Sequence, residues 1–443
     1  MTSDTTRNRG KNRTVSTLMR GAALAGALAA GVGTAAAEPV KFWSQPYGDL
    51  LQWQSSLEKN IQAFTAETGI EVDLQIINWS SAFSNWLTVA QGGAAPDCAD
   101  MFWLYSFSGI GGDKYGPKPI NDHRSAWPEL DKDFFPGSLT DVNWQGDFYG
   151  IPWRVDVRPI LVSRTALDEA GLAAAPDNWD EIVAHAKALT KRDDNGNVSR
   201  WGYNFGMTNA PQALVPLYWQ AGGSFMSDDG KTATIDNDEM RATLQWMHDM
   251  IWEHKVVNPD FMEPSYDPQA DFVSGNLAMV GSVAPNWGSQ LSSQYPELNG
   301  SWEMAIAPKG PKNRDTYSGA GYWGVLRGTD KEAECVKLIE FLSQNDQMQS
   351  LSEASSAVSP RRSVMASNYW ADEPWKKVLS ASLEYGRTSQ HPSPVWSALV
   401  SPKPGSVIYD MMYDALVAQK NIDEVVSAAQ VRMQVEMNRS SDN

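Results

Sequence analysis

Three charged residues alternate with valines in residues 149–164, which read YGIPWRVDVRPILVSR. If this segment is a strand, Arg154, Asp156 and Arg158 share one face, because successive strand side chains point to opposite sides. A carboxylate can accept two hydroxyl protons, and a guanidinium can orient that carboxylate or donate to a ligand itself. Three interpretations are open at this point: a solvated strand edge, a structural ion pair, or a strand that crosses a ligand cleft.

Aromatic residues are the second group that could bind a ligand. The chain has 19 Trp, 14 Tyr and 13 Phe, and several of the tryptophans follow predicted strands. The C–H faces of a sugar ring can stack on an indole while its hydroxyls bond to carboxylates, amides and guanidiniums. Each tryptophan could equally be a core residue, since packing is the usual role of Trp.

The elements that would position these residues begin with a β-α-β-α-β pattern. Apolar residues indicate strands at 40–43, 70–76 and 98–104. A helix with Leu57, Ile61 and Phe64 at helical spacing and Gly69 at its end separates the first two strands, and a helix at about 82–91 separates the last two. Such alternation predicts a parallel sheet, and ligands bind beyond the carboxyl ends of parallel strands. The residues that we expect at those ends are Trp43, Gln45, Tyr47, Trp79, Trp103 and Tyr105.

The pattern of strands and helices continues after the charged segment, so the sequence predicts a second α/β lobe. No low-complexity linker separates the two halves, which favours strand-like segments as the join. Two helices at 407–418 and 424–437 are expected to pack on the second lobe.

Residues 1–37 have the layout of a secretory signal peptide, with a basic start, an apolar run at 21–32 and a small-residue cleavage site near Ala37. Without this leader the chain has 31 basic and 52 acidic residues, a net charge of −21. Such a charge disfavours nucleic acid and anionic membranes as partners.

The sequence offers little for catalysis or for a cofactor. The five histidines are scattered, and His248 and His254 are six residues apart, so they do not share a helix face for a metal. No Gly-x-Ser-x-Gly elbow, Walker motif or dinucleotide glycine pattern is present. We therefore expect a protein that is not an enzyme and has no cofactor. An exported carbohydrate hydrolase or lyase is the alternative, because 52 acidic residues allow many carboxylate pairs. Cys98 and Cys335 could form a disulfide or remain free.

Eight short stretches together resemble the family 1 extracellular solute-binding proteins of ABC importers, the group that contains the maltose-binding protein. They follow the family's order and span most of the chain. They are FTAETGIEV (64–72), APDCAD (95–100), YGIP (149–152), NWDEIVAHAKALT (178–190), FVSGNLAMVGS (272–282), GAGYWG (319–324), CVKLIEFLS (335–343) and SPRRS (359–363).

This resemblance implies an α/β fold of the type II periplasmic-binding-protein class, with two lobes joined by a multi-segment hinge. The N-terminal lobe would comprise 38–153 and 318–358, and the C-terminal lobe 154–317 and 359–443. The chain would cross between the lobes at 153–159, at 307–321 and at 358–362.

The resemblance also implies a function, the capture of a sugar or oligosaccharide in the periplasm and its delivery to an ABC permease in the inner membrane. We expect a monomer. A phosphorylated polyol such as glycerol 3-phosphate is the alternative ligand, which Arg154, Arg158, Arg361 and Arg362 would have to hold.

On this family pattern, the charged segment crosses between the lobes, so Asp156 and Arg158 would line the cleft floor. Trp287 is the first candidate for a sugar platform, and Tyr322 with Trp323 is the second. Arg361, at the third crossing, could donate to ligand hydroxyls or cap a helix end.

Overall fold

The computed structural model describes residues 38–102, 104–206, 211–388, 391 and 393–441. The predicted leader and the predicted site residue Trp103 therefore lie outside the described residues. Apart from Glu38, all of the described residues belong to one unit, Pro39–Asn443. In this described part of the chain, every helix is too short or too polar to cross a lipid bilayer.

Three parallel strands connected by two helices open the fold, as the sequence predicts. They are β1 (Val40–Ser44), α1 (Leu50–Thr68), β2 (Val72–Ile76), α2 (Trp79–Ala90) and β3 (Cys98–Met101). Strand β1 lies between β2 and β3 and is parallel to both. The third strand is shorter than predicted, because Leu104 begins helix α3 (Leu104–Gly111) instead of ending β3.

Helix α1 shows why these elements form where they do. Asp49 accepts hydrogen bonds from the first backbone N–H groups of the helix, and Gly69 ends it in the left-handed conformation, with φ of 72°. Leu57, Ile61 and Phe64 recur at helical spacing and are buried. The predicted helix is confirmed, and it turns the chain back toward the start of β2.

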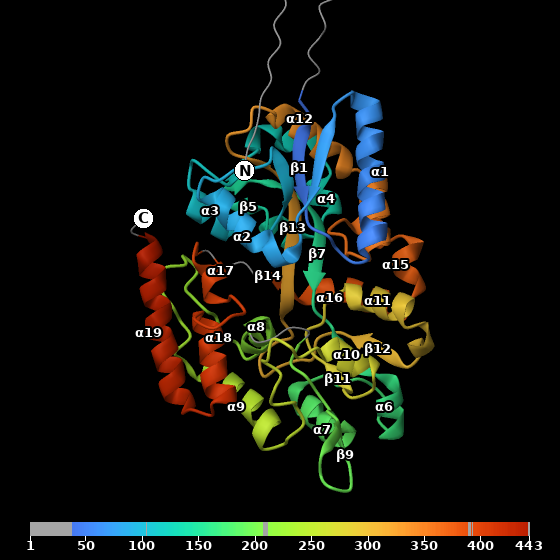
Figure 1. The fold of residues 1–443 in the computed structure, drawn as a ribbon, viewed down its shortest axis with the longest axis vertical. Coiled ribbons are helices and arrows are strands. Elements are labelled where there is room, and N and C mark those ends of the chain that lie inside the picture. Colours follow the sequence, from blue (N-terminus) through green and yellow to red (C-terminus); the bar gives the residue numbers. More distant parts are fainter. Residues whose placement is uncertain (1–37, 103, 207–210, 389–390, 392, 442–443) are drawn as a thin grey trace, which may run out of the picture. The chain divides into compact units, whose positions relative to one another are not determined.

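A long strand, β13 (Thr316–Leu326), connects the parallel strands to the rest of the chain. It runs antiparallel to β3 and to β7 (Gly150–Val157), with a register shift at Gly321. Figure 1 shows β7 and β13 side by side along the centre of the described unit. Val155 of β7 also forms a bridge with Val358, so three segments that are distant in sequence meet here.

A second sheet follows β7. Its strands are β11 (Met279–Val280), β8 (Ile160–Ser163) and β12 (Trp302–Ala305), in that order, and both pairs are antiparallel. The second half of the chain thus alternates strands and helices like the first half, but with a different sheet topology.

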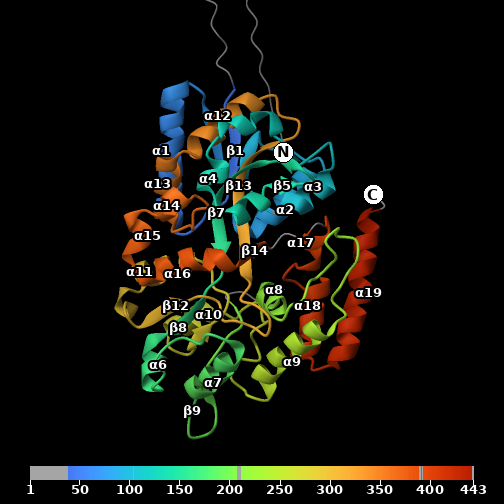
Figure 2. The ribbon, with the colours of Figure 1, turned by 180° about the vertical axis from the view of Figure 1, so that it is seen from behind.

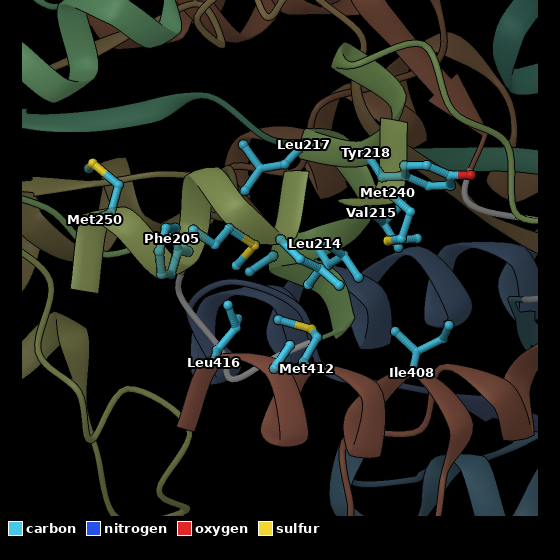
Figure 3. Packing of buried hydrophobic residues seen from close by; sticks show 14 of the residues in the cluster. Phe205, Leu214, Val215, Leu217, Tyr218, Met240, Met250, Ile408, Met412 and Leu416 are labelled. Atoms are coloured by element: carbon cyan, nitrogen blue, oxygen red, sulfur yellow. The ribbon is translucent and has the colours of Figure 1, made fainter. Parts of the chain in front are cut away.

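The C-terminal helices pack as the sequence predicts. Helix α18 (Val407–Met412), the π-helical turn η4 (Tyr413–Val417) and α19 (Ile422–Ser441) share a core with α8 (Pro211–Gln220) and α9 (Asp238–Trp252). Figure 2 shows α18 and α19 side by side. In Figure 3, Met412 and Leu416 point toward Leu214 of α8. Apolar burial therefore fixes the end of the chain on this core.

The remaining elements complete the fold. The strands are β4 (Pro117–Lys118), β5 (Asn143–Trp144), β6 (Asp147–Phe148), β9 (Lys191–Arg192), β10 (Val198–Arg200) and β14 (Gly386–Thr388). Two of them, β4 and β14, pair with β13 in the large sheet. The helices are η1 (Asn121–Ala126), α4 (Leu130–Asp133), α5 (Pro136–Thr140), α6 (Arg164–Glu169), α7 (Trp179–Leu189), α10 (Pro268–Val273), α11 (Asn286–Gln294), η2 (Pro296–Leu298), α12 (Glu332–Leu342), α13 (Asn345–Ser355), α14 (Arg362–Met365), α15 (Asn368–Asp372), α16 (Pro374–Ser382), η3 (Leu383–Tyr385) and α17 (Trp396–Leu399).

The two cysteines form a disulfide, a pairing that the sequence left open. Cys98 of β3 and Cys335 of α12 are both fully buried, and 237 positions separate them in the sequence. The bond therefore ties the parallel strands to a helix from the second half of the chain.

We expect the double substitution Cys98→Ala and Cys335→Ala to lower the free energy of unfolding by about 2–5 kcal/mol, because the cross-link restricts the unfolded chain. Urea denaturation followed by circular dichroism measures the change. Each single variant should lose as much as the double variant, since either one removes the bond. A double variant with the midpoint of the unmodified protein would contradict the prediction.

Candidate functional site

A cavity of about 710 Å³ lies beside β7 and β13. Its volume is in the range of small-molecule sites. Its lining comes from the loop after β1, the starts of α1 and α2, the residue after β3, both long strands, α8, α11 and the region of α17. The lining residues are Pro46, Tyr47, Gly48, Leu50, Trp79, Phe83, Phe102, Arg154, Asp156, Arg158, Gln212, Ala284, Asn286, Tyr317, Gly319, Ala320, Ser397, Ser401 and Pro402.

The charged face of β7 forms part of this lining. Arg154, Asp156 and Arg158 all border the cavity, while the alternating Val155 and Val157 are buried in a hydrophobic cluster. The period of two in a strand accounts for both sets. Of the three interpretations of this segment, the solvated edge is excluded, because Arg154 and Arg158 are buried and β7 pairs with β13.

Asp156 and Arg158 form a bidentate ion pair. The Arg158 Nε donates to Asp156 Oδ1 at 2.9 Å, and Nη2 donates to Oδ2 at 2.5 Å. The guanidinium of Arg158 also lies 5.0 Å from the centre of the Tyr317 ring. The Asp156 side chain is 18% exposed. Asp156 therefore forms a structural ion pair with Arg158 and also faces the cavity. Both roles are possible because each carboxylate oxygen can accept more than one hydrogen bond.

Arg154 is held by aromatic rings more than by hydrogen bonds. Its guanidinium carbon lies 5.0 Å from the ring centre of Tyr47, 5.3 Å from that of Trp79 and 5.4 Å from that of Trp153. Its Nε and Nη2 atoms are buried without a hydrogen-bond partner. Such a ring cage stabilises a cation through the ring quadrupoles.

Gly321 is required for this placement of Arg154. A Cβ atom at this position would lie 2.4 Å from the Arg154 guanidinium carbon, far inside van der Waals contact. The glycine therefore lets the guanidinium lie directly against β13, at the point where the β7–β13 register shifts.

Asp100, which the sequence did not single out, lies behind Arg154. It is fully buried, accepts a hydrogen bond from Trp153 Nε1 at 2.9 Å, and has Oδ1 3.8 Å from Arg154 Nη2. Burial raises the pKa of Asp100 above its ordinary value, although Arg154 and the Trp153 bond act in the opposite direction. Asp100 thus fixes the position of Trp153, which in turn lies against Arg154.

Tyr47 and Trp79, both predicted site residues, line the cavity together with Asp156 and Arg158. Trp79 is 44% exposed, and its Nε1 donates to the Pro46 carbonyl at 2.6 Å, which fixes the indole. The Tyr47 hydroxyl is buried without a hydrogen-bond partner, and burial raises its pKa well above 10. These two rings are the aromatic surfaces at the cavity that the sequence predicted.

The structure places the other described candidates away from this cavity, each for a local reason. Trp43 donates to Gln75 Oε1 and contacts the Trp86 ring edge-on. Gln45 is fully buried, because it directly follows β1 under the packed helices. Trp287 is buried in a hydrophobic cluster, whereas its neighbour Asn286 lines the cavity.

Tyr322, Trp323 and Arg361 also point into packed regions. Tyr322 and Trp323 are buried with the core around β3, and Trp323 stacks on Trp153 at 5.6 Å between ring centres. Arg361 donates to Asp133 Oδ2 at 2.5 Å and to the Ser343 carbonyl at 2.6 Å. With these partners, Arg361 joins α4 to the segment before α14 rather than lining the cavity.

Several lining residues were missed by sequence reasoning. Phe102 lies next to the predicted strand-end residue Trp103, and Tyr317 lies in a predicted crossing segment. The sequence could therefore have marked both residues as candidates for the cavity lining. Phe83 and Gln212 lie on helices and have no motif that marks them. Within the described residues, no cluster of three or more histidine, cysteine or acidic side chains could hold a metal ion.

Comparisons with known proteins show what the chain as a whole is similar to. The family model described as bacterial extracellular solute-binding protein matches residues 47–349. An arabinooligosaccharide-binding protein from Halalkalibacterium halodurans is 27% identical over 259 residues, which are 56% of this chain and 54% of that protein. The match therefore spans little more than half of that relative's length.

Two further similarities cover more of the chain. An erythritol/L-threitol-binding protein from Mycolicibacterium smegmatis is 22% identical over 399 residues, which are 84% of this chain and 79% of that protein. The sugar-binding protein MalE from Xanthomonas citri superposes with a TM-score of 0.76 at 19% identity, over 91% of this chain and 98% of that one.

Proposed function

Because this chain belongs to the family of bacterial extracellular solute-binding proteins, we propose that it captures a sugar or oligosaccharide for an ABC importer. Its fold is that of the type II periplasmic binding proteins, with two α/β lobes joined by a multi-segment hinge. The cavity, which is lined by the charged face of β7 and by the rings of Tyr47 and Trp79, carries the proposal. The names of the two relatives, which specify arabinooligosaccharides and small polyols, support a polyhydroxy ligand.

In the proposed complex, Asp156 accepts hydrogen bonds from ligand hydroxyls while Arg158 holds its carboxylate in place. Charge-assisted bonds of this kind are shorter and stronger than neutral ones. The exposed indole of Trp79 offers a flat apolar surface for the C–H face of a sugar ring. Gln212 and Asn286, from α8 and α11, supply amide groups on the other side.

We assign residues 38–153 and 318–358 to the N-terminal lobe and residues 154–317 and 359–443 to the C-terminal lobe. The meeting of β7, β13 and Val358 supports this division, since these segments would be the three crossings. A ligand that contacts both lobes only when they close shifts the population toward the closed form. The closed form would then deliver the ligand to a permease in the inner membrane.

The proposal also states where the protein acts and that it binds its ligand without converting it. Residues 1–37 would direct export and be cleaved near Ala37, which leaves the mature protein in the periplasm as a monomer. The protein would bind its ligand without chemical turnover and without a cofactor, and its acidic net charge would keep nucleic acid away.

The test is a thermal-unfolding screen against arabino-, malto- and mannooligosaccharides and erythritol. Saturation with the correct ligand should raise the unfolding temperature, because a ligand at 100 times its dissociation constant stabilises the folded state by about 2.7 kcal/mol. Chromatography of the same mixtures should show no products. Product formation would favour a hydrolase or lyase and overturn the binding proposal.

Small-angle scattering tests lobe closure separately. The radius of gyration should fall when the best ligand is added to saturation. Superimposable curves at saturated binding would show that the protein binds without closing.

A further inference from the structure

One part of the cavity lining is entirely apolar or aromatic. We call it the apolar wall, and it comes from the loop after β1, the starts of α1 and α2, and the residue after β3. Its members are Pro46, Tyr47, Leu50, Trp79, Phe83 and Phe102. None of them carries a charge or a side-chain amide. In Figure 1 their elements lie above the level of α8 and α11, which also contribute residues to the lining.

The polar atoms of the apolar wall are not available to a sugar as an array of hydrogen-bonding groups. The Trp79 Nε1 already donates to the Pro46 carbonyl. The Tyr47 hydroxyl is enclosed by protein, and the Arg154 guanidinium lies over the Tyr47 ring. Hydroxyl groups placed along this wall would lose their bonds to water without replacement, which costs free energy.

The rest of the described lining contains the charged and amide side chains. Arg154, Asp156 and Arg158 of β7 carry the charges of the described lining, and Gln212 and Asn286 add amides. Arg154 lies over the Tyr47 and Trp79 rings, so donors border that part of the apolar wall, whereas Leu50, Phe83 and Phe102 bring no donor or acceptor of their own side chains.

The apolar wall also holds large hydrophobic side chains that water reaches. Leu50 is 46% exposed and Trp79 is 44% exposed, whereas most leucines and tryptophans of the chain are buried. One indole is enough to stack one sugar ring, but Leu50, Phe83 and Phe102 extend the wall beyond that contact. A ligand that covered them with apolar atoms would remove this surface from water.

We propose that the ligand is a glycoside that carries an apolar aryl or acyl substituent, which lies against Leu50, Phe83 and Phe102 while its sugar faces β7. This inference rests on the proposed function and narrows its substrate class.

The experiment compares matched pairs of probes. Methyl and 4-nitrophenyl glycosides of arabinofuranose, glucopyranose and mannopyranose are titrated calorimetrically into the full mature chain. We expect at least one 4-nitrophenyl glycoside to bind about tenfold or more tightly than its methyl partner, the discrimination that a hydrophobic pocket achieves for a small apolar group. The substitution Leu50→Asn should reduce this ratio to about threefold or less, with the methyl glycoside affected less than twofold.

Leu51→Asn is the matched control. Leu51 is the next residue of α1, is 78% exposed and does not line the cavity, so this variant should keep the full ratio. Two results would overturn the apolar-substituent inference and leave the proposed function intact. One is equal affinity for the methyl and 4-nitrophenyl glycosides in every pair, and the other is an equal loss of affinity for both glycosides in Leu50→Asn. Binding of no glycoside of either kind would overturn both. If Leu50→Asn does not fold, the ratio of the two affinities in the unmodified protein, 4-nitrophenyl against methyl glycoside, tests the inference by itself.

Discussion

Replacing Asp156 with alanine should raise the dissociation constant of the best sugar ligand at least 100-fold and abolish its thermal stabilisation. The carboxylate is proposed to accept two hydroxyl protons, and each charge-assisted hydrogen bond contributes about 1.5–3 kcal/mol. The same substitution leaves the Arg158 guanidinium buried without its carboxylate. Breaking one partner of a buried pair costs about 3–5 kcal/mol, so the free energy of unfolding should also fall by that amount.

A second ion pair supplies the control for this substitution. Asp168 pairs with Arg164 Nε at 2.9 Å, is 68% exposed and does not line the cavity. Asp168→Ala should change stability by less than about 1 kcal/mol, as exposed pairs do, and leave binding unchanged. Calorimetric titration and urea denaturation measure both effects. Normal sugar binding by a folded Asp156→Ala protein would remove Asp156 from the proposed site.

The second large effect is expected at Arg361. Its guanidinium donates to Asp133 Oδ2 at 2.5 Å and to the Ser343 carbonyl at 2.6 Å, and its Nη2 lies 3.5 Å from Glu129 Oε1. Arg361→Ala removes one donor and the charge partner from Asp133, which keeps its hydrogen bonds from Ser363, and it leaves the Ser343 carbonyl without the Arg361 donor. We expect the free energy of unfolding to fall by about 1.5–3 kcal/mol, the range for hydrogen bonds to charged groups, while the affinity for sugar changes little, because Arg361 does not line the cavity.

The pH dependence of stability tests the same cluster. Burial alone raises the pKa of Asp133, but hydrogen bonds from Ser363 and Arg361 outweigh it and hold the pKa below its ordinary value. The stability that this carboxylate contributes is therefore complete above its unfolded pKa of about 4, and it is lost as the pH falls through the lower folded pKa. Arg361→Ala should weaken this loss below about pH 4.

Arg362→Ala is the control for both measurements. Arg362 is exposed, and its guanidinium lies 4.3 Å from the Phe135 ring centre, a contact worth about 0.5–1 kcal/mol at such sites. Its pH profile should match that of the unmodified protein. An Arg361→Ala protein as stable as Arg362→Ala would show that the buried cluster does not stabilise the fold.

Local patterns in the sequence determined the first strands and helices, the charged face of β7 and the family of this protein. The β-α-β-α-β start was predictable because hydrophobic periodicity and the helix-ending Gly69 act within a few residues, and the structure adds the Asp49 cap. The shared face of Arg154, Asp156 and Arg158 followed from the period of two in a strand. The family was recognisable because eight short stretches occur in the family's order. That the four cavity-lining residues Tyr47, Trp79, Asp156 and Arg158 bind ligand stays a prediction.

Only the tertiary structure decided which faces are covered. Trp287 and Asn286 are neighbours on α11, yet one is buried and the other lines the cavity, because successive helical residues point about 100° apart. Trp323 stacks on Trp153, and Phe83 and Phe102 border the cavity, through contacts between segments that are distant in sequence. The Cys98–Cys335 bond likewise joins residues 237 positions apart. Periodicity fixes which side chains share a face, but long-range packing determines whether that face meets the core or the ligand.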